Sequence, residues 1–343
     1  MSNYIDVLGI GIAAVDDLIY VDEYPPVDCK IPTAGKARQG GGPACTAIAA
    51  VGSLGGRAAY VARFGDNELS TFIKSALLHH HTDVTHIVND TYGGPYHSTI
   101  LVDGLGHRNV FYDATMYRPV APENLPASLI RSARVVLLDH ITEPSLVPVA
   151  EKARSLGVLV LGDIEGCTES ARELAALTDY LIVPRAWALW ATDASEPSEA
   201  CAVLAQVERR ATVVTDSARG CYCSSISHPK VQHFPAFKVD VFDSNGCGDT
   251  FHGAFALAVA RGLTVEQAIP FASAAAALKA AAAGGESRGW DALPTLDEVL
   301  RFLEARLTKS DGTLLLQAIH ARIAAVSEGT TNASPDAEAG VSL

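Results

Sequence analysis

The segment "DSNGCGDTFHGAF", residues 243–255, places an acid beside residues with very small side chains. Gly246 and Gly248 allow a ligand to approach the main chain closely, and Asp249 follows them directly. The apolar pattern after them predicts a helix over residues 249–262, whose free N–H groups and dipole would favour an anion at its start. From these residues alone, the carboxylate is either the N-cap of that helix or a base beside a phosphate-binding pocket.

Two other glycine-containing segments differ from known nucleotide-binding loops. "GIGIAA" (9–14) follows a strand-like run, but "VDDLIYVDEY" after it predicts a strand where a dinucleotide site requires a helix. A P-loop requires G-x-x-x-x-G-K-[ST], and the only Gly-Lys pair, Gly35-Lys36, is followed by Ala37. The sequence therefore disfavours NAD binding and excludes a P-loop kinase.

Composition and charge limit the classes of partner. The chain has 343 residues and a formal net charge of −13 without a long basic run, so neither nucleic acid nor an anionic membrane is an expected partner. No apolar run reaches the roughly 20 residues that a membrane-spanning helix needs. The start of the sequence lacks a basic region of the kind found in signal peptides, and the seven cysteines contain no CxxC pair. We expect reduced thiols and a cytoplasmic location.

The order of the predicted elements indicates an α/β fold. From residue 134, apolar strand-like runs alternate with amphipathic helical runs. The predicted strands are "ARVVLLD", "VLVLGD", "YLIVP" and "TVVTDS", and the predicted helices are "PSLVPVAEKARSLG", "ESARELAALT", "SEACAVLAQV" and residues 249–262 and 264–283. Such alternation is typical of a mostly parallel sheet that is covered by helices on both faces.

The N-terminal third contains more hairpin-like sequence. A strand–turn–strand pattern covers "YIDVLGIGIAAVDDLIYV", and residues 96–113 predict a hairpin at the edge of the main sheet. Asp66 is the expected cap of a helix that ends near Leu78. The last residues, "SEGTTNASPDAEAGVSL", are small, polar and acidic, which is typical of disorder.

Three of these segments together resemble the PfkB (ribokinase-like) carbohydrate kinase family. "DSNGCGDTFHGAF" resembles its C-terminal signature, D-T-x-G-A-G-D-x-F-x-G-A, and residues 40–67 resemble its N-terminal Gly-Gly motif with the G-x-x-G-D continuation. "VLGIGIAAVDDLIYV" resembles its first strand. The resemblance covers about residues 4–305 and implies a three-layer sandwich with a mostly parallel central sheet and a small β lid.

The resemblance also implies a division of the chain and a possible partner. Residues 1–308 would form the kinase domain, with the lid taken from about 18–38 and 96–113. Residues 309–343 would form a C-terminal helical extension and a disordered tail. Because the lid of this family often forms a dimer contact, a homodimer through the lid is a further expectation.

ATP-dependent phosphorylation of a primary sugar hydroxyl is the activity that the resemblance implies, with Mg²⁺ as the accompanying cation. Asp249 would be the catalytic base. The remaining site residues fall into three groups: the anion hole Gly246, Cys247 and Gly248; the substrate-binding Asp16, Gly41, Gly42, Lys30 and Tyr112; and the ATP-binding Thr215, Ser217, Gly220 and Asp243.

Three positions depart from the family pattern. Cys247 stands where the family usually has Ala, and Ser217 replaces the first Gly of T-x-G-x-x-G. The N-x-x-E motif, which is tied to Mg²⁺ and phosphate, has no matching acid after "DYLIV". The residues that hold the metal are therefore unknown. Arg185 in that segment would either contact a phosphate or lie on the surface.

The sequence leaves the acceptor open. The signature segment together with "GGGPA" most resembles the sulfofructose kinase branch, and Lys30 lies at a matching distance before Gly40. Tyr112, however, carries no positive charge for a sulfonate, which leaves Lys36, Arg38 and Arg108 as substitutes or as solvated lid charges. A neutral ketose, another sugar or a nucleoside fits about as well. A nucleoside kinase would use lid aromatics such as Tyr96, Phe111 and Tyr112, and a catalytically weak sugar-binding protein would explain the missing N-x-x-E.

Overall fold

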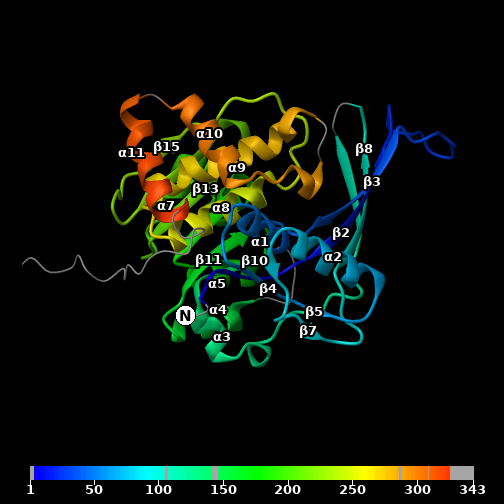
Figure 1. The fold of residues 1–343 in the computed structure, drawn as a ribbon, viewed down its shortest axis with the longest axis horizontal. Coiled ribbons are helices and arrows are strands. Elements are labelled where there is room, and N and C mark those ends of the chain that lie inside the picture. Colours follow the sequence, from blue (N-terminus) through cyan, green and yellow to red (C-terminus); the bar gives the residue numbers. More distant parts are fainter. Residues whose placement is uncertain (1–3, 105–106, 141–145, 286–287, 308, 325–343) are drawn as a thin grey trace, which may run out of the picture.

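A nine-stranded sheet forms the centre of the fold (Figure 1). The computed structural model describes residues 4–104, 107–140, 146–285, 288–307 and 309–324. Its strands, in spatial order, are β15 (Gln232–Phe234), β14 (Cys221–Ser225), β13 (Ala211–Thr215), β12 (Tyr180–Pro184), β11 (Leu159–Ile164), β10 (Ala133–His140), β1 (Ile5–Ile10), β4 (Ala58–Val61) and β6 (Thr82–Asp83). The strands from β6 to β13 run parallel, whereas β14 pairs antiparallel with β13 and β15 pairs antiparallel with β14. The predicted mostly parallel sheet is therefore confirmed.

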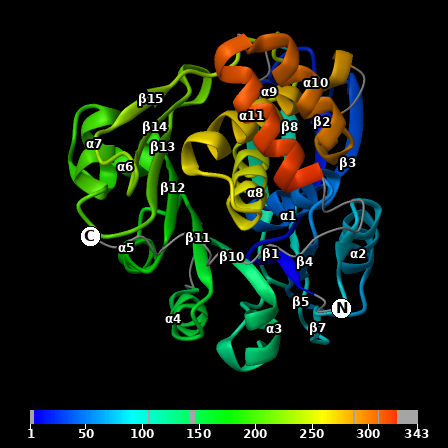
Figure 2. The same ribbon diagram turned by 60° about the vertical axis from the view of Figure 1, so that its left-hand side comes forward.

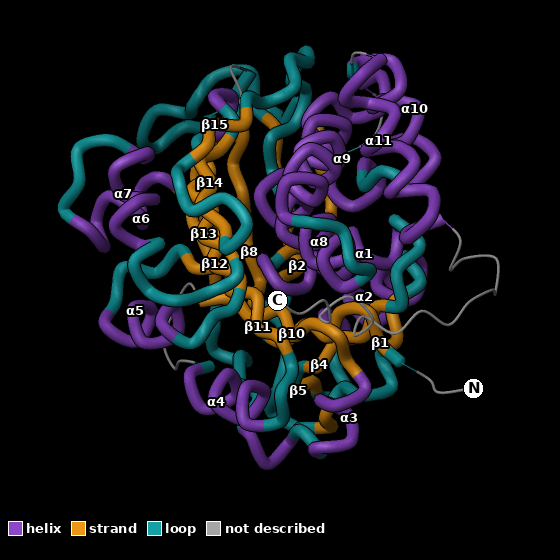
Figure 3. Tube along the Cα trace, turned by 90° about the vertical axis from the view of Figure 1, so that its left-hand side faces the viewer, coloured by secondary structure: helices purple, strands orange, loops and turns teal. Residues whose placement is uncertain are grey.

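Helices cover both faces of this sheet and make three layers (Figures 2 and 3). Successive residues of a strand point to opposite faces, so Val7 and Leu8 of β1 belong to different hydrophobic clusters. The cluster around Val7 contains residues of α1 (Pro43–Ser53), α2 (Glu68–His79), α8 (Cys247–Ala260), α9 (Val265–Gly285), α10 (Leu296–Arg306) and α11 (Lys309–Ile319). The cluster around Leu8 contains residues of α3 (Ala127–Ser132), α4 (Val147–Ser155), α5 (Glu169–Ala176), α6 (Arg185–Thr192) and α7 (Pro197–Leu204).

A separate four-stranded sheet extends away from the central sheet (Figure 1). Its order is β3-β2-β8-β9, and its strands are β2 (Ala14–Tyr20), β3 (Gly35–Gly41), β8 (Tyr96–Val102) and β9 (Arg108–Asp113). A further pair joins β5 (Arg63–Phe64) to β7 (Val88–Asn89). The segments expected to form the lid, 18–38 and 96–113, supply most of the four-stranded sheet, with residues 105–106 outside the described ranges.

Two expected helix starts differ from the structure. The cap of α2 is Asn67, not Asp66, because the side chain of Asn67 accepts a hydrogen bond from the Ser70 N–H at 2.9 Å. The helix of the signature segment begins at Cys247, and its N-cap is Gly246. Asp249 lies within the first turn of α8, so the N-cap role considered for it is wrong.

The antiparallel strands β14 and β15 were not predicted. Their sequences, "CYCSS" and "QHF", are short and mix apolar with polar residues, so they lack the aliphatic run that marked the other strands. At the C-terminus, α11 continues into a segment over His320–Ala324, and the expected disordered tail lies outside the described residues. No helix in the described ranges has the length and apolar character required to cross a bilayer.

Candidate active site

One small cavity, of about 50 Å³, brings together residues that are far apart in the sequence. It contains five of the residues expected in the site, namely Asp16, Gly41, Gly42, Gly246 and Asp249. Seven further lining residues were not predicted: Gln39, Gly40, Thr46, Asn245, Lys279, Gly289 and Trp290. The four-stranded sheet, the starts of α1 and α8 and the end of α9 therefore meet at one place.

The start of α8 presents a bare stretch of main chain. Gly246 has a φ of 73°, a left-handed conformation that a residue with a side chain rarely adopts. The first intrahelical bond joins the Thr250 N–H to the Gly246 carbonyl at 2.9 Å, so the N–H groups of residues 247–249 precede the hydrogen-bonded part of the helix. Of these, the Cys247 N–H makes a long hydrogen bond of 3.5 Å to the Ser244 carbonyl oxygen. A Cβ placed on Gly248 would meet open space. These N–H groups and the helix dipole make the segment suitable for an anion.

The thiol of Cys247 does not add negative charge to this segment. The residue is half-buried, and burial raises the pKa of the thiol to about 11. At neutral pH it is therefore protonated. Its Sγ lies 3.7 Å from the Asp243 carbonyl oxygen, within the same loop.

The carboxyl group of Asp249 lies in an environment that disfavours its charged form. Burial raises its pKa well above the ordinary value, and the nearby carboxylates of Asp163 and Glu165 raise it further. His252, one turn along α8, acts in the opposite direction. A carboxylate with a raised pKa accepts a proton more readily than an ordinary surface aspartate does.

Asp163 and His252 connect α8 to the carboxyl ends of the central strands. Asp163 is 1% exposed, and the Nε2 atom of His252 lies 3.3 Å from its Oδ1 and 3.2 Å from the carbonyl oxygen of Ile182. The Nδ1 atom of His252 lies 2.7 Å from the Gly248 carbonyl oxygen. Within the described part of the chain, neither carboxylate oxygen of Asp163 has a hydrogen-bond partner. Asp163 is thus an acid with unused ligand capacity at the edge where ligands of parallel sheets bind.

Asp16 is held by neighbouring strands of the four-stranded sheet. It is 6% exposed and lies opposite Gln39 on β3 and Ser98 on β8. Burial raises the pKa of Asp16, while hydrogen bonds with Ser98 and Gln39 lower it. The side chain borders the cavity, where its oxygens can accept hydrogen bonds from a polyhydroxyl ligand.

The glycine segment before α1 allows the four-stranded sheet to lie close to the helices. A Cβ on Gly41 would lie 2.3 Å from Oδ2 of Asp16. Gly42 has a φ of 87°, and a Cβ there would lie 2.3 Å from the Ile12 carbonyl oxygen. Larger residues at either position would therefore displace Asp16 or the chain that follows β1.

Asp139, at the end of β10, holds the chain after β1 and the start of α1 in place. Its Oδ2 accepts hydrogen bonds from the Ile12 N–H at 2.8 Å and from the Ala44 N–H at 3.0 Å. Asp139 is 3% exposed, and burial raises its pKa to about 6 against the lowering effect of these two bonds. It therefore joins β10, the end of β1 and the start of α1.

The residues expected to contact ATP fall into two places. Thr215, Ser217 and Gly220 lie together at the turn between β13 and β14. Ser217 has a φ of 50°, so the backbone keeps the left-handed conformation that suits the glycine of the family motif. Asp243 lies instead in the loop before α8, where its Oδ1 accepts a hydrogen bond from the Asn245 N–H at 2.9 Å.

Arg185 begins α6 and lies near this turn. Its Nη1 is 3.8 Å from Oδ1 of Asp216, and Arg219 makes two shorter contacts with the same carboxylate, at 2.7 and 2.6 Å. These hydrogen bonds from Arg219 lower the pKa of Asp216. Arg185 is therefore paired with an acid and is part of a cluster that the sequence pattern did not indicate.

Lys30 and Tyr112 are not among the residues that line the cavity. Lys30 is exposed in the connection between β2 and β3. Tyr112 is 59% exposed on β9, and its ring stacks on that of Tyr96 with centroids 5.6 Å apart. Another lid residue does reach the loop before α8, because Nη1 of Arg108 donates a hydrogen bond to Oδ1 of Asn245 at 3.2 Å.

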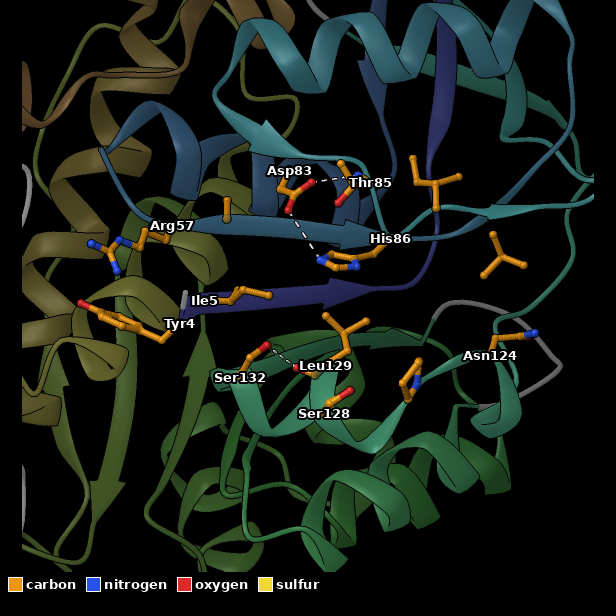
Figure 4. A pocket seen from close by; sticks show the side chains of 14 residues that line it. Tyr4, Ile5, Arg57, Asp83, Thr85, His86, Asn124, Ser128, Leu129 and Ser132 are labelled. Atoms are coloured by element: carbon orange, nitrogen blue, oxygen red, sulfur yellow. Dashed lines mark hydrogen bonds and ion pairs between the residues drawn. The ribbon is translucent and has the colours of Figure 1, made fainter. Parts of the chain in front are cut away.

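A larger hollow of about 850 Å³ lies at the opposite edge of the central sheet (Figure 4). It is lined by residues at the amino ends of β1 and β4, including Tyr4 and Arg57, whose guanidinium carbon lies 4.4 Å from the centre of the Tyr4 ring. Asp83 and His86 form an ion pair there at 3.5 Å when the imidazole is protonated. None of the residues expected in the site lines this hollow, so the chemistry is assigned to the smaller cavity.

Comparisons with known proteins show what the chain is similar to. The sequence profile described as "pfkB family carbohydrate kinase" matches residues 5–291. The chain is 27% identical over 306 residues to an ATP-dependent ribose-1-phosphate kinase from Halopiger xanaduensis, an alignment covering 88% of this chain and 98% of the relative.

Two solved structures share the fold. A putative ribokinase from Agrobacterium tumefaciens superimposes with a TM-score of 0.76 at 28% identity, covering 86% of this chain and 96% of that one. A ribokinase from Arabidopsis thaliana, determined with ribose and ATP, gives a TM-score of 0.77 at 20% identity, covering 89% of this chain and 100% of that one.

The environment of Asp139 generates a prediction about pH and stability. Because its pKa is raised on folding, the folded state binds more protons than the unfolded state between about pH 4 and pH 6, so this group's contribution to stability falls as the pH rises through that range. Asp139→Asn keeps an oxygen acceptor and removes the titration.

Urea unfolding of both proteins at pH 4.5 and pH 7 measures the effect. We expect the free energy of unfolding of the wild type to fall relative to that of Asp139→Asn by roughly 2 kcal/mol, because the carboxyl group of the unfolded chain is already largely ionised at pH 4.5. A difference between the two proteins that is the same at both pH values would contradict the assignment.

Proposed function

The chain belongs to the pfkB family of carbohydrate kinases, and we propose that it transfers the γ-phosphoryl group of ATP to a primary hydroxyl of a sugar. The observation that carries the proposal is the shared cavity. Carboxyl groups of Asp16 and Asp249 border one space, next to the main chain of Gly246. One acid can orient the acceptor while the other removes its proton.

Asp249 is the proposed base. As the hydroxyl oxygen attacks the γ-phosphorus, its proton passes to the Asp249 carboxylate. A new O–P bond forms, the bond from the γ-phosphorus to the bridging oxygen breaks, and ADP leaves. The main-chain N–H groups of Gly246, Cys247 and Gly248 would stabilise the charge on the transferring group, since donors fixed before the reaction need no reorganisation.

Asp16, Gly41 and Gly42 are the proposed sites for the other hydroxyl groups of the sugar. Asp16 is the best supported of the three, because its buried carboxyl group borders the cavity and the strands on both sides hold it in place. A sugar held at two or more hydroxyls has one primary hydroxyl directed towards Asp249. Such positioning accounts for much of the rate enhancement in reactions of this kind.

ATP is the proposed phosphoryl donor, with its nucleotide towards Thr215, Ser217 and Gly220. Among the described residues, no group of three or more His, Cys, Asp or Glu side chains could hold a metal ion. Asp163, a buried acid whose carboxylate oxygens have no hydrogen-bond partner among the described residues, would help to hold the Mg²⁺ ion that accompanies ATP. The cation would neutralise charge on the β- and γ-phosphates.

The four-stranded sheet is the proposed lid. The cavity beneath it, about 50 Å³, is much smaller than the roughly 300–1,000 Å³ of typical ligand pockets, so the lid must move to admit a sugar. The contact between Arg108 on β9 and Asn245 would then hold the lid down. Closure excludes water, which would otherwise compete with the sugar as acceptor.

Two groups of lid residues bear on which acceptor the enzyme would phosphorylate. Lys30 is the residue that would favour the sulfofructose branch, and it lies exposed on the lid, where closure could bring it to a sulfonate. A nucleoside acceptor is the second candidate, because Tyr96 lies against Tyr112 and Tyr117, with the centroids of the Tyr96 and Tyr117 rings 5.2 Å apart. A base could stack on such a cluster.

Substitution of the proposed base gives the first test of the mechanism. Asp249→Asn should lower kcat by about 10²–10⁴-fold, because the amide cannot accept the proton, while the affinity for ATP changes little. Asp297→Asn, which removes the same charge from the first turn of α10, is the matched control and should be unaffected. Near-normal turnover by Asp249→Asn would rule out the base.

A coupled ADP-release assay over a panel of acceptors tests the substrate. We expect the highest kcat/KM with a neutral or sulfonated sugar that has a free primary hydroxyl. A nucleoside as the preferred acceptor would replace the sugar assignment with the second candidate. Binding of sugars without turnover on any acceptor would indicate a sugar-binding protein and contradict the kinase proposal.

The outer strand of the lid supports a homodimer. β9 is an edge strand, and its apolar residues Val110, Phe111 and Tyr112 are 48%, 62% and 59% exposed. Light scattering should give the mass of a dimer for the wild type and of a monomer for Phe111→Glu. Ile226→Glu, at an exposed apolar residue that follows β14 of the central sheet, is the control and should stay dimeric. A monomeric wild type, or a dimeric Phe111→Glu, would contradict the lid contact.

A further inference from the structure

A lysine is buried in the wall of the proposed active site. Lys279, near the end of α9, has a side chain that is 1% exposed and lies in the run "FASAAAALKAAAAGG". Transfer of an ammonium group out of water is costly unless the group is paired. Its position therefore calls for an explanation in terms of its neighbours.

Within the described part of the chain, the ammonium group of this lysine pairs with the carboxylate of Asp243. Nζ of Lys279 lies 3.5 Å from Oδ2 of Asp243, which is also 3.5 Å from the Gly289 N–H. Strong charge-assisted hydrogen bonds are shorter, about 2.7–2.9 Å. The ammonium group is thus held by Asp243 with donor capacity remaining for another acceptor.

Lys279 also lies beside the bare main chain of the α8 start. A Cβ built on Gly246 would be 4.0 Å from Cε of Lys279 and 3.9 Å from Oδ2 of Asp249. The lysine and the proposed base therefore both lie close to Gly246. Among the described residues that line the cavity, Lys279 is the one with a positively charged side chain.

The charges around the cavity give this cation a role. Asp16 and Asp249 line the cavity, and Asp243 pairs with the lysine that lines it. A γ-phosphoryl group would bring further negative charge. In a site with little water, a fixed cation next to developing charge is worth far more than one in solvent. Arg108 is another cation near the loop, but it is exposed and comes from the lid.

We propose that Lys279 is a built-in cation of the phosphoryl-transfer site, held in place by Asp243, that stabilises the anionic phosphoryl group at the start of α8. This inference rests on the proposed kinase function. The competing explanation is that Lys279 only neutralises Asp243 and keeps the loop folded. The two explanations predict different activities for a variant from which both charges are removed.

Four variants separate them: Lys279→Met, Lys279→Arg, the double variant Asp243→Asn/Lys279→Met, and Lys230→Met as a control. Lys230 is exposed near β15, so its substitution changes the net charge equally without touching the cavity. For each folded protein, kcat and the KM of the sugar are measured. The affinity for orthovanadate in the presence of ADP and Mg²⁺, and for ADP and Mg²⁺ alone, is measured by calorimetry.

For Lys279→Met we expect kcat to fall about 10²-fold, the typical cost of removing one stabilising group, with less than about 3-fold change in sugar KM. Vanadate affinity should fall at least about 10-fold while ADP affinity is kept. Lys279→Arg should recover most of the activity, and Lys230→Met should match the wild type. The double variant should remain slow while it keeps its affinity for ADP, which rules out lost nucleotide binding through Asp243 as the cause. If Lys279→Met does not fold, the double variant takes its place in these measurements. It also lacks the charge of Lys279, and it leaves no acid without a partner.

Unchanged vanadate affinity in the neutral variants, or wild-type kcat in the double variant, would overturn the proposal. The vanadate measurement does not depend on finding the acceptor. If the wild type turns over no sugar or nucleoside, the proposed function fails, and the difference in vanadate affinity still decides whether Lys279 stabilises a phosphoryl-like anion.

Discussion

The arrangement on which the site depends is a carboxylate held at the start of a helix among other acids. The N-terminus of α8 favours a negative charge near Asp249, as helix dipoles do. Burial and the carboxylates of Asp163 and Glu165 oppose that charge and raise the pKa of Asp249. The opposition yields a carboxyl group that readily accepts a proton, next to main-chain donors that favour an anion. A general base for phosphoryl transfer requires both properties.

The rest of the fold holds this carboxylate beside the cavity that is the proposed substrate site. α8 packs so closely on α1 that a Cβ on Gly253 would lie 2.1 Å from the Ala47 carbonyl oxygen. Asp139 ties the start of α1 to the end of β1, and the glycine segment after β3 lets Asp16 approach the same cavity. These contacts connect the four-stranded sheet to the helix layer at the cavity. In the proposed mechanism, the four-stranded sheet would move as a lid while Asp249 and the main chain at the start of α8 stay in place.

The sequence predicted much of the fold because its signals there are local. Strands such as β10 and β11 are continuous apolar runs followed by amphipathic helices, and the pattern alone indicates a parallel sheet. Short strands without an aliphatic run, such as β14, carry no such signal. Asn67 capped α2 in place of Asp66, because the choice between adjacent capping residues depends on where the helix begins. Sequence patterns locate such boundaries poorly.

The residues of the candidate site also divide into those that the sequence indicated and those that it did not. Asp249, Gly246, Asp16 and the Gly41-Gly42 pair stand in motifs, and the structure brings them to one cavity. Lys279 and Trp290 stand in none, because their role depends on the packing of α9 and the segment after it against the start of α8. For Lys279, the available signal in the sequence was a lysine within an alanine-rich helical run. The pairing of Arg185 and Arg219 with Asp216 likewise joins residues from two turns.

The central claim is that Asp249 and the main chain before it act on the same reacting group. A crystal structure with ADP, Mg²⁺, aluminium fluoride and the sugar of highest kcat/KM would test it most directly. We expect the acceptor oxygen within hydrogen-bond distance of the Asp249 carboxyl group, and the metal fluoride against the N–H groups of residues 246–248. An Asp249 side chain turned away from the acceptor, or a fluoride bound elsewhere, would contradict the claim.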